Sequence, residues 1–231
     1  MTWPRAHVRF LTAVMAAAVF AVCGLTATQP PGVHPISGRQ YARPMGLAGA
    51  PWLDRDERER EEAPSRALAI MQVTPGSTVA DIGAGSGYFT ERLARLVGPT
   101  GKVYATDIQQ GMLDLVAKRL SSERIGNVVT VLSEPANPKL PPASIDMALM
   151  VDVYHELWEP QIVLRHIRDA LKPSGRLVLI EYKGEDPTIP IIPSHKMTVA
   201  QAKQELEAEG FVLTTANSSL PRQHVLIFTK K

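Results

Sequence analysis

The sequence predicts an α/β domain, a doubly wound parallel β-sheet with helices on both faces. Three observations predict it. Short apolar segments of strand length alternate with longer amphipathic segments between residues 65 and 231, which is the pattern of successive strand–helix–strand units. One apolar segment, residues 79–82, runs directly into a glycine-rich turn that opens a helix. The composition, 45% hydrophobic and 21% charged, is that of an ordinary globular protein.

Residues 1–28 are predicted to be a signal peptide or an N-terminal anchor. Arg5 and Arg9 precede an apolar run over residues 10–22, and small residues follow it, which is the layout of a secretory signal. The expected location is therefore periplasmic, or membrane-tethered through this segment alone, and cytoplasmic if the segment is not used. The alternative is a buried helix of the domain.

The charge balance argues against a nucleic-acid substrate. The formal net charge of +2 falls to zero once Arg5 and Arg9 are excluded with the predicted leader, so no basic surplus remains to hold a phosphate backbone. Cys23 is the single cysteine, which excludes a disulfide framework and a cysteine-based zinc site.

Residues 29–64 are predicted to form a linker followed by a lid helix. The first part is rich in proline and glycine, which favours irregular structure. Residues 54–62 alternate acids with arginines at helical spacings, so a helix there either presents a solvated charged face or covers the ligand site. Ser65 is expected to cap the next helix, with which the domain of residues 65–231 begins.

Residues 79–87 form the centre of the predicted site. Gly83, Gly85 and Gly87 stand at alternate positions, so the backbone can turn sharply and approach a ligand without a Cβ in the way. The helix that starts at Tyr88 points its free N–H groups toward the same place. The sequence therefore predicts a site for a ligand of nucleotide size at the carboxyl end of the first strand.

The spacing in this stretch argues against a dinucleotide. A dinucleotide-binding turn has its third glycine one residue later, at the position that Tyr88 occupies here. Asp81 stands two residues before Gly83, which is a poor place for a carboxylate beside a pyrophosphate. An acid there suits a ligand with an amino group and a positive charge. An NAD-linked oxidoreductase on a similar fold is thus the weaker alternative.

The order apolar-apolar-Asp-apolar-Gly-x-Gly-x-Gly over residues 79–87 resembles the first motif of the class I S-adenosyl-L-methionine (SAM) dependent methyltransferases. The resemblance covers residues 65–231. It implies a Rossmann-like, doubly wound, mostly parallel seven-stranded sheet with one antiparallel strand near the C-terminus, and S-adenosyl-L-methionine as cofactor. Residues 39–46, with Trp52 and Leu53, also resemble a segment that precedes the domain in some exported bacterial methyltransferases.

The cofactor is expected at the loops that follow the strands. Asp107 ends a strand over residues 102–107, where a carboxylate can accept hydrogen bonds from both ribose hydroxyls; its alternative role is to cap the next helix. Glu134 follows the third strand, where the family has an aspartate for the adenine amino group; its alternative is a surface carboxylate. The expected cofactor-binding residues are Asp81, Gly83, Gly85, Gly87, Asp107, Ile108, Glu134 and Asp152.

The later elements continue the alternation. A fourth strand over residues 144–151 delivers the segment 152–156 to the edge that carries the glycine turn. After it the sequence predicts a helix over 161–171, a turn over 172–175, a fifth strand over 176–182, a helix over 198–209 and a terminal pair of strands over 211–215 and 224–229.

Methyl transfer needs an aligned acceptor that has lost its proton. His155 is the expected general base because the ordinary pKa of histidine lies near neutrality, and its alternative is a structural hydrogen-bonding role. Tyr154 is expected to shape the pocket and Glu156 to orient the imidazole. His195, in a proline-bounded loop, is the second candidate base, and a surface histidine is its alternative.

No metal site is predicted, because the spacing of His155, Glu156, Glu181 and His195 does not form a compact metal motif. The Asn-Pro-Pro-aromatic motif of methyltransferases that act on adenine or glutamine is missing from the sequence. The leading interpretation is a SAM-dependent methyltransferase with a small-molecule acceptor. A non-catalytic SAM-binding module is the other alternative, beside the oxidoreductase.

Overall fold

The computed structural model describes Met1 and residues 32–231, and the predicted signal peptide or anchor lies outside these residues apart from Met1. None of the described helices is long and apolar enough to cross a membrane. Eight strands form one sheet. They are β1 (Thr78–Ile82), β2 (Lys102–Asp107), β3 (Val128–Leu132), β4 (Ile145–Val151), β5 (Leu171–Lys183), β6 (Lys196–Met197), β7 (Phe211–Asn217) and β8 (Gln223–Lys230).

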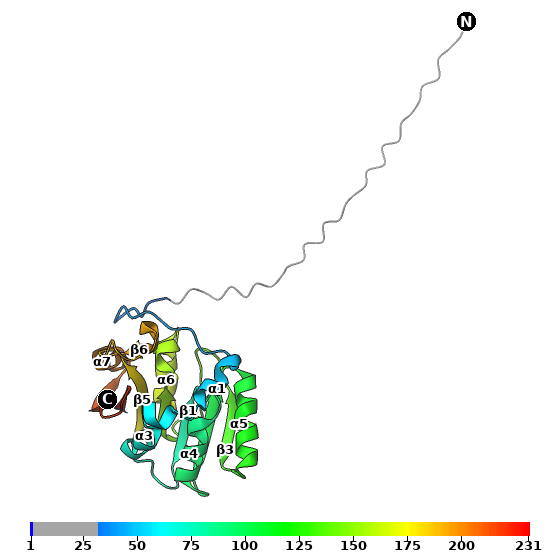
Figure 1. Cartoon of the computed structure of the whole chain (residues 1–231), viewed down its shortest axis with the longest axis vertical. Helices are drawn as coiled ribbons and strands as arrows, with labels where there is room; N and C mark the ends of the chain where they lie inside the picture. The colour runs from blue at the N-terminus through cyan, green and yellow to red at the C-terminus, as the bar shows by residue number, and fades with distance from the viewer. Residues whose placement is uncertain (2–31) are drawn as a thin grey trace. The chain divides into compact units, whose positions relative to one another are not determined.

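The sheet is doubly wound and mostly parallel, as predicted (Figure 1). The main path has the order β3-β2-β1-β4-β5-β8-β7, and the two-residue strand β6 pairs with β5 beside it. Among the described strands β8 alone runs opposite to the others, and it pairs antiparallel with β5 and β7. The predicted seven strands with one antiparallel strand near the C-terminus are therefore confirmed for the main path, and β6 is an addition.

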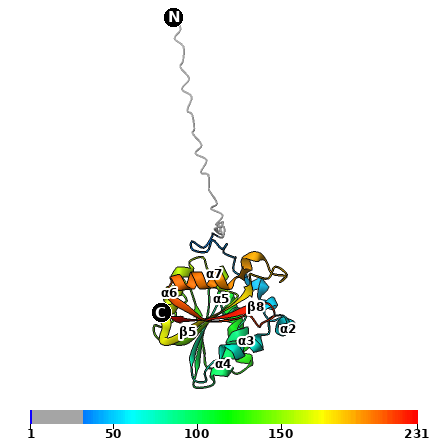
Figure 2. The same ribbon diagram turned by 90° about the vertical axis from the view of Figure 1, so that its left-hand side faces the viewer.

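Helices cover both faces of this sheet. The longer ones are α3 (Pro64–Met71), α4 (Tyr88–Val97), α5 (Gln110–Ser122), α6 (Pro160–Ala170) and α7 (Val199–Ala208). Helices α3, α4 and α5 pack on one face, and α6 and α7 pack on the other (Figure 2). The short helices are η1 (Leu47–Gly49), α1 (Ala50–Leu53), α2 (Arg58–Glu62), η2 (Tyr154–Glu156) and η3 (Pro193–His195), of which the η elements are 3₁₀-helices.

Helix α4 illustrates how local sequence sets these elements. Phe89, Leu93 and Val97 recur every four residues and are buried on the sheet. The helix ends at Gly98, whose φ of 69° favours glycine. Helix α7 likewise begins in a capping box, in which Thr198 exchanges hydrogen bonds with the residue three positions on. Elements with such local signals were predicted to within a few residues.

Strand β5 is longer than the sequence predicts. A turn was expected over residues 172–175, whereas β5 begins at Leu171. Leu171 pairs with Ile145 of β4, and the register shifts before the next pair, Met147 with Arg176. The proline- and glycine-containing segment is therefore an irregularity within the strand instead of its start.

Helix α3 also begins differently from its prediction. Ala63, with a φ of 51°, precedes it and Pro64 occupies its first position. Proline suits this position because its missing N–H would be unpaired there anyway. Ser65 lies inside the helix, and its Oγ donates to Glu59 Oε2 at 3.0 Å. The predicted cap at Ser65 is therefore wrong.

Residues 32–45 form an N-terminal strap that packs on the domain. Arg39 is buried against α7, where it pairs with Glu205. At the other end of the strap the carbonyl of Met45 accepts a hydrogen bond from Gln109 Nε2 at 2.8 Å. Part of the predicted linker thus has a fixed place in the fold.

Candidate functional site

The glycine turn after β1 has the conformation that its sequence requires. Gly83, Gly85 and Gly87 have φ values of 71°, 54° and 82°, a region that disfavours residues with a side chain. A Cβ on Gly83 would lie 2.5 Å from the Val153 side chain, and one on Gly85 would lie 2.7 Å from Leu53. The turn therefore tolerates glycine alone at these points.

Asp107, at the end of β2, connects this turn to the start of α5. Its Oδ2 accepts a hydrogen bond from the Gly85 N–H at 3.0 Å, and its Oδ1 accepts one from the Gln109 N–H at 2.9 Å. Burial raises the pKa of Asp107, and these backbone hydrogen bonds oppose the increase. The carboxylate thus fixes two loops while it lines a cavity.

Asp152, which follows β4, has one carboxylate oxygen that forms no hydrogen bond with the described residues. The residue has a φ of 55°, and its Oδ2 accepts a hydrogen bond from Gln223 Nε2 at 2.7 Å. Its Oδ1 is buried and has no hydrogen-bond partner within the described chain. Burial, together with the carboxylates of Glu62 and Glu181, raises the pKa of Asp152 well above its usual range. A cationic amino group bound here would satisfy this oxygen.

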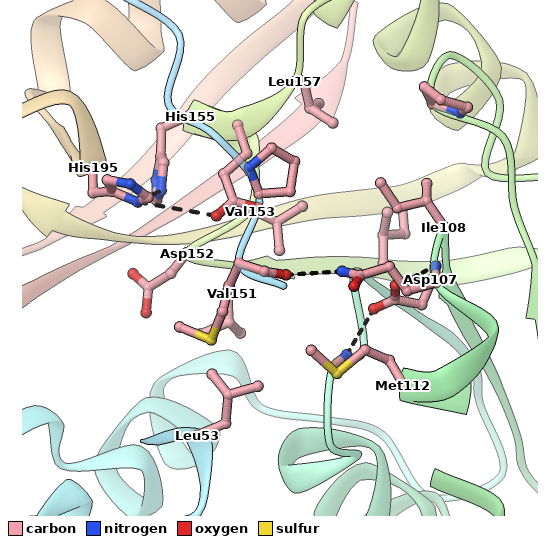
Figure 3. A pocket seen from close by; sticks show the side chains of 18 of the residues that line it. Leu53, Asp107, Ile108, Met112, Val151, Asp152, Val153, His155, Leu157 and His195 are labelled. Atoms are coloured by element: carbon pink, nitrogen blue, oxygen red, sulfur yellow. Dashed lines mark hydrogen bonds and ion pairs between the residues drawn. The ribbon is translucent and has the colours of Figure 1, made fainter. Parts of the chain in front are cut away.

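A single cavity of about 590 Å³ joins these groups to a pair of histidines (Figure 3). One side, which we call the glycine end, consists of Gly83, Gly85, Asp107, Ile108, Glu134 and Asp152. The other side, the histidine end, consists of His155, Glu156 and His195. In Figure 3 the two histidines lie across the pocket from Asp107 and Ile108, with Val153 between them and Asp152 on the histidine side.

Three of the predicted site residues do not line the cavity. Asp81 is buried beneath the glycine turn, where its Oδ2 accepts a hydrogen bond from Thr90 Oγ1 at 2.6 Å. Burial raises the pKa of Asp81 to about 6. Gly87 lies at the start of α4 and packs beside Val116. Any effect of Asp81 or Gly87 on a ligand is therefore indirect in this conformation.

Tyr154 is the third, and its predicted role in shaping the pocket is wrong. The side chain is fully buried in the hydrophobic core on the α6 and α7 face of the sheet. The guanidinium of Arg39 lies 5.6 Å from its ring centroid. Because consecutive residues of the η2 turn point in different directions, His155 reaches the cavity and Tyr154 does not.

At the histidine end, the side chains of Glu181, His155 and His195 form a hydrogen-bonded chain. His155 Nδ1 lies 2.5 Å from Glu181 Oε2, and His155 Nε2 lies 3.1 Å from His195 Nδ1. Glu181 also accepts a hydrogen bond from the Tyr154 N–H at 3.0 Å through Oε1. Glu181 therefore orients the His155 imidazole, and the prediction that Glu156 does so is wrong. Glu156 instead lies 4.0 Å from His195 Nδ1.

The two imidazoles differ in their electrostatic surroundings. Burial lowers the pKa of His155, whereas the negative charge of Glu181 and its hydrogen bond raise it. Together these raising effects are larger, so the pKa of His155 lies above its ordinary value. Burial and the neighbouring His155 lower the pKa of His195. Burial raises the pKa of Glu156 to about 7. A positive charge on the pair is thus most stable on His155, beside Glu181.

The N-terminal strap contributes two hydrogen bonds to this end. Arg39 Nη1 and the Ala42 N–H each donate to the carbonyl of His155 at 3.0 Å. The Arg39 guanidinium is itself held by Glu205, with Nε and Nη2 each 3.1 Å from a carboxylate oxygen. The strap therefore fixes the backbone that carries His155.

Sequence reasoning missed Glu181 as a partner of His155, although one signal was available. The Asp152 N–H donates to the carbonyl of Ile180, because β4 and β5 are parallel neighbours. Two strand ends in this register bring polar residues that follow β4 beside polar residues at the end of β5. The contacts of Arg39 and Ala42 had no such local signal.

The charged run over residues 54–62 is also more buried than a solvated face. Arg58 and Glu62 are buried, and Arg58 Nε donates to Glu62 Oε2 at 2.8 Å. Tyr182 Oη donates to Glu62 Oε1 at 2.5 Å. Arg58 lines the cavity together with Leu53, so this segment borders the site.

Folding also brings together three side chains that can ligate a metal. One ligand atom from each of His155, Glu156 and His195 lies within 4.8 Å of the others. Their separation in sequence concealed this arrangement, because η2 and η3 follow different strands.

Comparison with known proteins agrees with this geometry. Residues 80–177 match the family model described as a methyltransferase domain. A SAM dependent methyltransferase from Aquifex aeolicus has a TM-score of 0.76 and 25% sequence identity, over 80% of this chain and 98% of that one. Residues 80–177 are therefore similar to a methyltransferase domain, and the fold is that of a SAM dependent methyltransferase. The cofactor of this domain is SAM.

Curated relatives match about half of the chain. The ubiquinone/menaquinone biosynthesis C-methyltransferase UbiE of Ectopseudomonas mendocina is 33% identical over 116 residues, which are 50% of this chain and 45% of that protein. The UbiE of Hahella chejuensis is 32% identical over 121 residues, 52% of this chain and 48% of that protein. The chain thus spans about half the length of the curated relatives it matches.

A further solved structure supports the fold alone. The putative O-methyltransferase of Nostoc punctiforme has a TM-score of 0.65 at 17% identity, and the match covers 80% of this chain and 60% of that one. The methyltransferase domain is therefore similar in fold to proteins with differing descriptions, and its acceptor has to be argued from its own site.

The residues of the glycine end fit SAM. The cofactor carries a cationic amino group, which suits the unpaired Oδ1 of Asp152. Its ribose hydroxyls suit the Asp107 carboxylate, and Ile108 and Met112 offer apolar contacts for a purine ring. These individual contacts remain predictions.

Proposed function

We propose that this protein transfers a methyl group from SAM to a small-molecule acceptor that binds at the histidine end of the cavity. One observation carries the proposal: the glycine end and the histidine end border the same cavity of about 590 Å³. Small-molecule sites typically have volumes of about 300–1,000 Å³. One cavity can therefore hold a cofactor and a small acceptor side by side.

The glycine end holds the cofactor in this proposal. Bound SAM supplies an electrophilic methyl group on a positively charged sulfur. Asp107 binds the ribose, Glu134 binds the adenine amino group, and Asp152 binds the amino group of the methionine part. Gly83 and Gly85 allow the backbone to approach, and Ile108 covers the purine. The protein thus contributes alignment more than bond chemistry.

The acceptor is a compound with an apolar body. Trp158, Val163, Ile191 and Ile192 line the cavity, and the carbonyl of Ile192 accepts a hydrogen bond from the His195 N–H. Apolar walls with a few polar groups favour a ligand that buries hydrocarbon or aromatic surface and orients through one polar atom. The UbiE relatives, whose names specify C-methylation in quinone biosynthesis, support an aromatic acceptor of this kind.

The histidine pair removes the acceptor's proton. The His195 side chain is 30% exposed and the His155 side chain only 1%, so His195 is the imidazole that meets the acceptor. In the uncharged pair, His195 Nε2 takes the proton while its Nδ1–H donates to His155 Nε2. Shifting that Nδ1 proton to His155 places the charge beside Glu181. His155 therefore serves as the base through His195, not by direct contact.

The test is turnover of SAM by the full chain with pools of phenols, quinols and other small aromatic metabolites, read as S-adenosylhomocysteine release. His195→Ala and His155→Ala should each lower turnover by about 10²–10⁴ while SAM affinity stays within about twofold. His166, on the exposed side of α6, provides the matched control, and His166→Ala should leave both unchanged.

Three results would contradict the proposal, the first two in whole and the third in its proton step. SAM binding without turnover on any pool would favour the non-catalytic binding module. Binding of NAD in place of SAM, measured by calorimetry, would favour the oxidoreductase. Normal turnover in both histidine variants would mean that the histidines do not remove the acceptor's proton. The histidine end would then only align the acceptor with the methyl group.

We also propose that residues 1–28 direct export or tether the protein to the membrane. The supporting observation is the basic start followed by an apolar run in the sequence. Mass spectrometry of the native protein should find the mature N-terminus near residue 29 if the segment is cleaved, or the protein in the membrane fraction if it is retained. An intact chain in the cytosolic fraction would contradict both forms.

A further inference from the structure

We propose that His155, Glu156 and His195 form a site for one divalent transition-metal ion, and that the bound ion takes the histidine pair out of use as a base. The site lies at the histidine end of the cavity, between η2 and η3. Binding of the ion stands on the geometry alone. Its effect on turnover rests on the proposed methyl transfer.

The spacing of the two imidazoles suits a shared ion. His155 Nε2 and His195 Nδ1 are 3.1 Å apart. An ion about 2.05 Å from each nitrogen would subtend an angle of about 98°, between the octahedral and the tetrahedral values. The distance between the two nitrogens is therefore compatible with a shared ion, which the rings would meet by turning toward it.

Glu156 supplies a third ligand on the same side. Its Oε1 lies 4.0 Å from His195 Nδ1, and its side chain is 16% exposed. All three ligand atoms already lie within 4.8 Å of one another. Closure by about an ångström would bring the carboxylate to the usual distance of about 2.0–2.2 Å from the ion.

Glu181 provides the support that a metal-binding histidine requires. Histidines that ligate metals almost always donate their other ring N–H to a carboxylate or carbonyl, which fixes the tautomer and the ring orientation. Here His155 Nδ1 faces Glu181 Oε2 at 2.5 Å, and both side chains are fully buried. His155 Nε2 is therefore held in place facing His195 Nδ1, beside the position proposed for the ion.

The ligand set selects the class of ion. Two imidazoles and one carboxylate suit Zn²⁺, Co²⁺ or Ni²⁺, whereas Mg²⁺ and Ca²⁺ prefer oxygen ligands. Three protein ligands leave at least one position open, and the cavity lies beside the site. Water or a polar atom of the acceptor can occupy that position.

The bound ion and the proton relay exclude each other. Metal binding at Nδ1 of a neutral His195 leaves its single proton on Nε2. That nitrogen then has no lone pair to accept a proton from the acceptor. The lone pair of His155 Nε2 is also used by the ion, so the shifted proton has nowhere to go. The ion should therefore inhibit turnover without displacing SAM.

The experiment is calorimetric titration of the full chain with Zn²⁺ alone, followed by the visible absorption spectrum of the Co²⁺ form. The wild type should bind one ion per chain at this site, and Co²⁺ should show the d–d bands of a low-coordinate nitrogen and oxygen site. His195→Ala should weaken Zn²⁺ binding by at least about 100-fold. Glu181→Gln, which keeps an oxygen for the Tyr154 N–H but removes the negative charge behind His155, should weaken it by about 10–100-fold.

Two controls test whether a loss of Zn²⁺ binding is specific to the site. His166→Ala removes an exposed histidine of α6 and should bind Zn²⁺ as the wild type does. SAM affinity of each variant, measured in parallel, reports whether the fold is retained; His195 is partly exposed, so its variant is the primary test. Zn²⁺ binding that is absent, or equal in wild type and His195→Ala, would overturn the site.

Turnover then tests the consequence. One equivalent of Zn²⁺ should lower methyl transfer at least about tenfold, and EDTA should restore it. A rate that rises with Zn²⁺ would overturn the inhibitory role. Since Zn²⁺ binding is measured without SAM or acceptor, its failure is separate from failure of the proposed methyl transfer.

Discussion

The glycine end of the cavity is built from short stretches of chain, whereas the histidine end is assembled from segments far apart in the sequence. Gly83, Gly85 and Asp107 lie at two adjacent strand ends. The Gly83 N–H donates to the Thr106 carbonyl, and the Gly85 N–H donates to the Asp107 carboxylate. The histidine end needs η2, η3, the end of β5 and the N-terminal strap at once. The glycine end therefore depends on local sequence, whereas the histidine end depends on the tertiary structure of this protein.

The largest expected effect separates the two ends completely. Gly85→Val should abolish SAM binding, because its Cβ would lie 2.7 Å from Leu53 and its φ of 54° disfavours a β-branched residue. Calorimetry with SAM measures the loss, and circular dichroism checks the fold. Zn²⁺ binding at the histidine end should persist in this variant. Retained SAM affinity would place the cofactor elsewhere.

The next effect concerns the buried acid beneath the glycine end. Burial raises the folded-state pKa of Asp81 to about 6 from an ordinary value of 3.8. The folded state therefore binds this proton more tightly, and its contribution to stability is present below pH 3.8 and lost as the pH rises through 6. Between pH 4 and 8 the free energy of unfolding of the wild type should fall relative to Asp81→Asn by up to about 3 kcal/mol.

Urea denaturation at several pH values measures that difference. A constant difference across the range would mean that Asp81 is already charged in the folded protein. SAM affinity of the same variant tests the separate prediction that Asp81 serves the cofactor, which its position beneath the turn makes indirect.

A smaller effect sharpens the assignment of Asp107. Asp107→Ala should weaken SAM binding by about 1–3 kcal/mol, because the ribose hydroxyls and the Gly85 N–H lose their acceptor. Asp107→Asn is the matched variant, since it keeps an oxygen acceptor, and should lose less. Equal affinity in wild type and Asp107→Ala would remove the residue from the cofactor site.

The smallest effect tests whether the strap belongs to the histidine end. Arg39→Lys loses the two-pronged contact with Glu205 and the hydrogen bond to the His155 carbonyl. We expect kcat to fall about tenfold as the His155 backbone shifts, with SAM affinity unchanged. Arg43→Lys alters a neighbouring arginine and is the control. A fall in SAM affinity that matches the fall in kcat would mean that the strap supports the whole domain instead.

The glycine end was predictable because its signals are local. Alternate glycines require positive φ values, and an acid at the end of β2 must lie beside the turn after β1 in a parallel sheet. The alternation of strand and helix fixed the layers for the same reason. Asp81 shows the limit, since a motif position does not reveal whether its side chain faces the ligand or the core.

The histidine end was predictable only in part, because its geometry depends on pairing between strands. His155 and His195 were selected by chemistry, but their mutual distance of 3.1 Å depends on how the loops after β4 and β5 fold back. Glu156 follows His155 in the chain and was the obvious partner, yet the register of β4 on β5 brings Glu181 to the imidazole. Burial of Arg58 followed from tertiary contacts that its charged neighbours concealed.

The two hydrogen bonds from the strap end on the main-chain carbonyl of residue 155, not on its imidazole. Attachment is thus indifferent to which side chain stands at that position. The side chain at position 155 can therefore be substituted while these two backbone hydrogen bonds are kept. Positions 155, 156 and 195 are therefore suitable for substitutions that redirect the domain to new acceptors, because the residues of the glycine end need not change.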